Sequence, residues 1–79
     1  MNNDAVISIY PNPVTGDVMT ISSNISTNAN YKIVNMMGSE VANGKLNNNQ
    51  ISVATLPTGI YMIEVYDNGK TASKRFIKK

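Results

Sequence analysis

Cysteine, histidine and tryptophan are all absent from this chain of 79 residues. Without cysteine there is no disulfide, no thiolate-bound zinc or iron–sulfur cluster and no cysteine nucleophile. Without histidine, the most common general base is missing as well. Only five carboxylates remain, at Asp4, Asp17, Glu40, Glu64 and Asp67. A catalytic site would have to be a buried carboxylate pair, so we predict that the chain is not an enzyme, with no catalytic residue, metal or cofactor.

Charged residues and strong helix formers are also scarce. Charged residues make up 15% of the chain, and it contains only two leucines, two glutamates and one glutamine. Uncharged polar residues replace them, among them twelve asparagines. This composition is typical of β-structure and turns and unfavourable to helices. Because the hydrophobic fraction of 42% is that of an ordinary globular domain, we expect one folded all-β domain.

The chain has no long hydrophobic run either. No stretch reaches the roughly 18 apolar residues that a membrane span needs, and residues 1–4 lack the basic-then-apolar pattern of a signal peptide. Five of the seven cations lie in the last ten positions, and no acid follows Asp67. A basic tail can bind nucleic acid or anionic lipid, or it can be a solvated strand. Nucleic-acid binding needs aromatic residues interleaved with the cations, and Phe76 is the only aromatic residue among them. We therefore do not predict a nucleic-acid partner.

Six segments rich in β-branched and aromatic residues are predicted to be strands. They are Val6–Tyr10, Val18–Ser22, Tyr31–Met37, Gln50–Ala54, Ile60–Tyr66 and Thr71–Lys78. Turn residues separate them: Pro11 and Pro13, Gly38, Asn43-Gly44, Gly59 and Asn68-Gly69. Asn43-Gly44 is the strongest short hairpin signal, because both residue types tolerate positive φ.

Strand spacing and facial patterns predict the architecture. About seven short strands at ten-residue spacing favour a small antiparallel β-sandwich that is immunoglobulin-like. Tyr31–Met37 carries apolar residues on both faces, which predicts a central strand. In Ile60–Tyr66, Glu64 marks the wetter face. The five methionines are scattered, and we interpret them as side chains that fill gaps within strands.

Two groups of residues are compatible with binding sites, and for each group a purely structural role is the simpler interpretation. Tyr31, Tyr61 and Tyr66 could form a platform for stacking sugars, but tyrosine is also common in sheet cores and edges. Asn47–Asn49 with Asp17 or Asp67 could coordinate calcium, although no loop has the acid density of a calcium loop. A small β-sandwich that acts as an adhesive or carbohydrate-binding module therefore stays open as an alternative function.

Four stretches of the chain, taken in order, resemble a known family. They are Tyr10–Pro13, Asn35–Val41, Leu56–Val65 and Lys74–Lys79. Their succession and their position against the C-terminus resemble the type A C-terminal sorting domain of the type IX secretion system of Bacteroidetes. The resemblance extends from about Ile7 to Lys79, nearly the whole chain.

The resemblance implies a function in export. Such domains are immunoglobulin-like sandwiches of seven strands at the end of larger exported proteins, so an upstream cargo domain would be absent from this chain. The precursor crosses the periplasm, a type IX outer-membrane receptor and translocon pass it to the cell surface, and a surface sortase removes the domain. Residues 1–5 would be a residual linker with an added initiator methionine, and residues 6–79 the sorting domain.

The resemblance also assigns roles to residues. Recognition by the receptor and sortase would depend on the last strand, through Lys74, Arg75, Phe76, Ile77, Lys78 and Lys79. We expect its cations to make direct contacts because they can stay exposed. Residues that match the family's motifs and determine the fold are Pro11, Pro13, Gly38, Gly59 and Tyr61.

Overall fold

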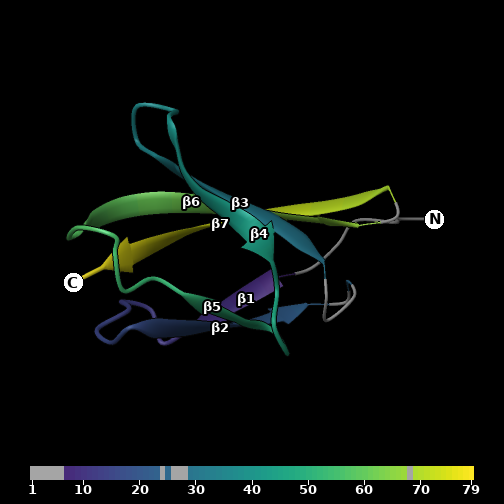
Figure 1. Cartoon of the computed structure of the whole chain (residues 1–79), viewed down its shortest axis with the longest axis horizontal. Helices are drawn as coiled ribbons and strands as arrows, with labels where there is room; N and C mark the ends of the chain where they lie inside the picture. Colours follow the sequence, from purple (N-terminus) through teal and green to yellow (C-terminus); the bar gives the residue numbers. More distant parts are fainter. Residues whose placement is uncertain (1–6, 24, 26–28, 68) are drawn as a thin grey trace.

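The computed structural model describes residues 7–23, 25, 29–67 and 69–79, and it consists of two antiparallel sheets packed face to face (Figure 1). One sheet has the order β1-β2-β5 and the other β4-β3-β6-β7. The strands are β1 (Ile7–Tyr10), β2 (Val18–Ser23), β3 (Asn30–Asn35), β4 (Glu40–Lys45), β5 (Gln50–Ser52), β6 (Gly59–Asp67) and β7 (Lys70–Lys78). This arrangement confirms the prediction of a small, seven-stranded antiparallel β-sandwich.

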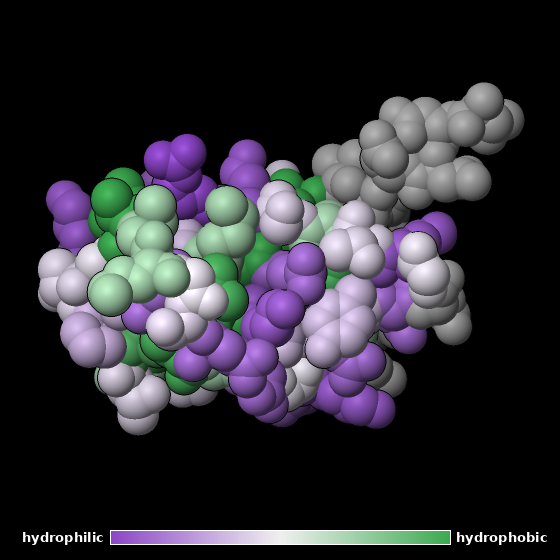
Figure 2. All heavy atoms as spheres, turned by 90° about the horizontal axis from the view of Figure 1, so that it is seen from above, coloured by the Kyte–Doolittle hydropathy of each residue, from purple (hydrophilic) through white to green (hydrophobic). Residues whose placement is uncertain are grey.

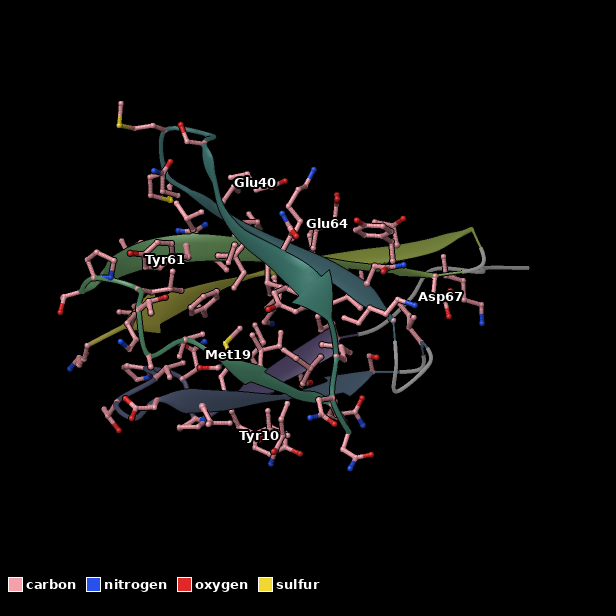
Figure 3. The ribbon with its side chains drawn as sticks, in the orientation of Figure 1. Tyr10, Met19, Glu40, Tyr61, Glu64 and Asp67 are labelled. Carbon is pink, nitrogen blue, oxygen red and sulfur yellow. The ribbon has the colours of Figure 1, made fainter. Side chains whose placement is uncertain are left out.

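The core lies between the sheets and follows the alternation of the strands. Met19 and Ile21 of β2 are fully buried, as are Ile33 of β3 and Ile63 and Val65 of β6. Figure 3 shows Met19 in the space between the two sheets. Alternate residues of a strand point to opposite faces, so each sheet contributes one apolar face to the core and leaves the other in solvent.

The long β6–β7 hairpin forms the C-terminal half of the four-stranded sheet. Its register runs from Gly59 opposite Lys78 to Asp67 opposite Lys70, which confirms the predicted antiparallel ribbon. β3 lies between β4 and β6 and is central, as its two apolar faces predicted, whereas β7 is an edge strand. Among the described residues, no helix is long and apolar enough to cross a membrane.

The predicted hairpin turn at Asn43-Gly44 is wrong, because both residues lie inside β4. Asn43 pairs with Lys32, and Gly44 pairs with Tyr31. The φ of Gly44 is 158°, an extended but positive value that residues with a side chain rarely adopt. A Cβ at this position would be 3.3 Å from the Tyr31 ring. The glycine thus leaves space for a cross-strand tyrosine and does not form a turn.

The turn between β3 and β4 comes earlier, and it shortens the predicted strand Tyr31–Met37 to end at Asn35. The Asn35 side-chain oxygen accepts hydrogen bonds from the backbone N–H of Met37 at 2.9 Å and of Ser39 at 3.1 Å. Gly38 has a φ of 85°, in the left-handed region that glycine adopts without a steric penalty. The side-chain hydrogen bonds of Asn35 therefore stabilise a turn at this point, and the strand does not continue.

The methionines do not share one structural role. Met19 is fully buried in the core, whereas Met36, Met37 and Met62 are 64%, 89% and 37% exposed. The interpretation of the methionines as gap-filling residues is therefore wrong for these three.

Candidate recognition strand and its anchoring

The six residues expected to mediate recognition divide into a buried pair and an exposed set. Phe76 is fully buried and Lys78 is 8% exposed, because both face the core from β7. Lys74, Arg75, Ile77 and Lys79 are exposed. The last strand therefore leaves four of the six side chains exposed to solvent and buries the other two within the fold.

Phe76 joins β7 to β6 through Tyr61. The two residues are directly opposite in the register, and their rings stack with centroids 5.6 Å apart at an interplanar angle of 25°. The Tyr61 hydroxyl donates a hydrogen bond of 2.7 Å to the Pro57 carbonyl. A Cβ on Gly59 would lie 3.7 Å from the Tyr61 ring, an ordinary contact distance. Tyr61, labelled in Figure 3, thus connects the turn before β6 to Phe76 of β7.

Lys78 is an anchoring residue, and the expectation that the tail cations stay exposed is wrong for it. Its Nζ donates a hydrogen bond of 3.0 Å to the Leu56 carbonyl. The alternation of β7 directs its side chain inward near the end of the sandwich, where Leu56 is also buried. A buried ammonium requires such a partner because an unpaired one would lose its hydration without compensation.

The segment containing the two prolines holds the end of β7 in place. The Val14 N–H donates to the Ile77 carbonyl at 2.7 Å, and the Lys79 N–H donates to the Val14 carbonyl at 2.9 Å. The Asn12 side-chain oxygen accepts from the Ile77 N–H at 3.2 Å. We call these three bonds the terminal clamp. Pro11 and Pro13, whose preceding peptide bonds are both cis, flank Asn12.

The rest of the β7 edge lies near β1 of the other sheet. The N–H and carbonyl of Ile77 bond to the clamp and so point away from β6. Because this direction alternates along an antiparallel strand, the backbone groups of Thr71, Ser73 and Arg75 point the same way. Within the described part of the chain, no strand pairs with this stretch. Gly38 lies far from it in the sheet order, in the turn leading to the opposite edge strand β4.

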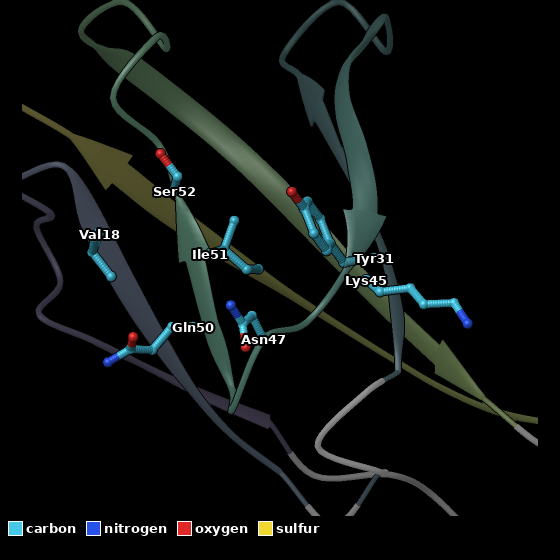
Figure 4. A pocket seen from close by; sticks show the side chains of 7 residues that line it. All are labelled: Val18, Tyr31, Lys45, Asn47, Gln50, Ile51 and Ser52. Atoms are coloured by element: carbon cyan, nitrogen blue, oxygen red, sulfur yellow. The ribbon is translucent and has the colours of Figure 1, made fainter.

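A separate cleft of about 320 Å³ opens beside β4 and β5 (Figure 4). Its lining includes Tyr31, Lys45, Asn47 and Gln50. The three tyrosines considered as a sugar platform are not brought together, because Tyr61 is buried and Tyr66 is on the opposite face of β6 from it.

The acidic residues are dispersed. In the described ranges, no three acidic side chains gather where they could hold a metal ion. Figure 3 shows Glu40 and Glu64 on the outer side of the four-stranded sheet. Glu64 forms an ion pair with Lys32 at 3.6 Å, and a Glu40 carboxylate oxygen accepts from the Asn43 amide at 2.7 Å.

The Tyr61 hydroxyl gives a first testable prediction. Tyr61→Phe keeps the stacked ring but leaves the Pro57 carbonyl without its donor. We expect the free energy of unfolding to fall by about 1 kcal/mol, the typical net contribution of one hydrogen bond. Urea unfolding followed by circular dichroism would measure it. Tyr66→Phe is the matched control, since Tyr66 is 39% exposed; an equal loss in both variants would contradict a specific role for the Tyr61 bond.

The sequence profile of a family described as "Secretion system C-terminal sorting domain" matches residues 8–79. Among curated proteins, none matches the chain significantly. A solved structure of PorZ, an essential surface component of the type-IX secretion system of Porphyromonas gingivalis, is similar in fold, with a TM-score of 0.71 and 22% sequence identity. The match covers 92% of this chain but only 11% of that one, so the chain corresponds to a small part of the larger protein.

Proposed function

Because the chain belongs to the C-terminal sorting domains of the type IX secretion system, we propose that it is the export address of a larger cargo protein. An outer-membrane receptor binds the folded domain, the translocon passes the cargo to the cell surface, and a surface sortase removes the domain. The domain is a signal and a sortase substrate in this scheme and performs no catalysis. The observation that carries the proposal is the family match, which spans residues 8–79.

We propose residues 6–79 as the sorting domain. Its last strand contains residues that anchor it in the fold and residues that remain exposed. Phe76, Lys78 and the terminal clamp keep the last strand in register. Lys74, Arg75, Ile77 and Lys79 remain exposed on it for contact with the receptor and sortase. Residues 1–5, proposed as the remainder of a linker with an added methionine, lie outside the described residues.

Export of a reporter tests the proposal. A signal peptide, a fluorescent protein, a linker of native length and residues 1–79 would be fused and expressed in a type IX-competent host. We expect the reporter at the cell surface or in the medium, without the domain. The control is a known sorting domain in the same linker. Periplasmic retention of a folded fusion, while the control is exported, would contradict the proposal and favour a small binding module.

A further inference from the structure

The outer face of the four-stranded sheet has an apolar half and a polar half. The apolar half lies where β3 ends and β6 begins; we call it the apolar end. It consists of Val34 of β3, Ile60 and Met62 of β6 and Ile77 of β7. The polar half begins at the Lys32–Glu64 ion pair and continues to Thr71 and Ser73. Figure 2 shows hydrophobic residues gathered toward the left of this face.

Cross-strand pairing makes the apolar end a continuous surface. Ile60 is directly opposite Ile77, and Met62 is directly opposite Val34 on the other side. Ile60, Met62 and Ile77 are 43%, 37% and 40% exposed. Single exposed apolar residues are normal, but a contiguous group across three strands marks an interaction site on a small soluble domain. The exposed side chain of Met62 is flexible and adapts readily to a partner surface.

Cations border this apolar surface. Arg75 is opposite Met62 in the register, and Lys79 follows the last residue of β7. The two acids on this face already have partners, Glu64 with Lys32 and Glu40 with Asn43. Within the described ranges, Arg75 and Lys79 form no ion pair. The charge at this end is therefore available to an acidic partner.

The outer edge of β7 adjoins the same surface. Arg75 directs its side chain to the outer face, while its backbone groups point to the unpaired edge. The apolar end, the Arg75 side chain and a β7 edge with which no described strand pairs thus lie next to one another. A partner that occupies all three gains apolar burial, charge pairing and main-chain hydrogen bonds together.

We propose that the apolar end is the docking surface for a protein of the secretion machinery whose contact region is apolar with an acidic rim. This inference rests on the proposed sorting function and specifies the surface that it uses. A second copy of the chain is a less favourable occupant, because both copies carry positive charge at this surface. A two-fold contact is formed by the same patch on both copies, so it would place the Arg75 and Lys79 cations of both copies in one interface, while Glu64 and Glu40 on this face already have partners.

Surface variants of the reporter fusion test the docking surface. The triple variant Ile60→Thr, Met62→Gln and Ile77→Thr keeps strand-compatible residues and removes the apolar contact. We expect surface delivery to fall about tenfold or more, as for loss of an interface hot spot. The matched control is Tyr10→Thr with Val18→Thr, which alters residues that are 53% and 46% exposed on the other sheet. The control should export at the level of the unmodified domain.

Charge variants test the chemistry of the partner. Arg75→Glu is expected to reduce delivery about tenfold, because it places an acid opposite an acidic rim, whereas Arg75→Lys should retain delivery. Equal delivery by Arg75→Glu and the unmodified domain would overturn the acidic-rim assignment. All variants would first be shown by circular dichroism and thermal unfolding to be folded. For any variant that does not fold, photo-crosslinking from position 62 replaces the export measurement, and position 10 is the control. We expect a crosslink to a secretion-machinery protein from position 62 alone.

Two outcomes distinguish failure of the docking surface from failure of the sorting function. Normal delivery by the folded triple variant would overturn the docking surface but leave the sorting function intact. Failure of the unmodified fusion, while a known sorting domain is exported, would overturn the sorting function itself. Two measurements on the isolated chain address other occupants. One is dimerisation in analytical ultracentrifugation, and the other is flotation with vesicles of equal parts phosphatidylcholine and phosphatidylglycerol. Either result would overturn the assignment of a protein partner if the triple variant abolished that dimerisation or flotation.

Discussion

Phe76→Ala is expected to reduce the free energy of unfolding by about 3–5 kcal/mol, the usual penalty for truncating a fully buried phenylalanine. Phe76 has no exposed surface and stacks on Tyr61 in the neighbouring strand. A domain of this size has a stability of only roughly 4–12 kcal/mol. The variant should therefore be partly or wholly unfolded, and urea unfolding followed by fluorescence of the tyrosines or circular dichroism would measure it.

The adjacent residue provides the control for this prediction. Ile77 is 40% exposed and points to the outer face of the same strand. Ile77→Ala should therefore lower the stability much less than Phe76→Ala. Similar losses in the two variants would show that β7 is not packed with Phe76 inward, and the proposed division between anchoring and exposed residues would then be wrong.

Removal of Ile77–Lys79 is expected to destabilise the domain by several kcal/mol and to abolish export. The deletion eliminates the three bonds of the terminal clamp and the bond from Lys78 to the Leu56 carbonyl. Each such bond contributes about 0.5–1.5 kcal/mol net. Thermal unfolding would measure the loss. Hydrogen exchange of the Val14 amide, which donates to Ile77, should accelerate in the truncated chain.

Two substitutions distinguish lost anchoring from lost recognition in this truncation. Lys78→Met keeps the aliphatic stem but removes the buried ammonium, so stability should fall by about 1–2 kcal/mol. Lys79→Ala keeps the backbone N–H that donates to Val14 and should leave stability nearly unchanged. If Lys79→Ala were as destabilising as the truncation, the clamp would not explain the effect of the last three residues.

Strand positions could be predicted from the sequence where period-two alternation was strong. The β6 pattern of Tyr61, Ile63 and Val65 inward with Glu64 outward is found in the structure, and so is the antiparallel partner β7. The prediction failed at Asn43-Gly44, because the local turn preference of these residues was outweighed by pairing with Lys32 and Tyr31. Local propensity decides a turn only where tertiary pairing does not compete.

The composition of the candidate site was predictable in part. The basic last strand and its apolar neighbours were evident from the sequence. The burial of Lys78 was not, because it depends on the Leu56 carbonyl, 22 positions earlier in the chain. The apolar end was not predictable either, since it is formed by residues of β3, β6 and β7 that only the sheet order places together.

The terminal clamp also has a consequence for the timing of folding. Asn12 and Ile77 are 65 positions apart in the chain, so closing this contact requires a large loss of chain entropy, whereas the β6–β7 hairpin involves near neighbours. The hairpin is therefore expected to form early and the clamp late. A receptor that binds β7 only in its clamped form would recognise the finished fold and reject chains still folding, so the clamp would act as a kinetic checkpoint before export.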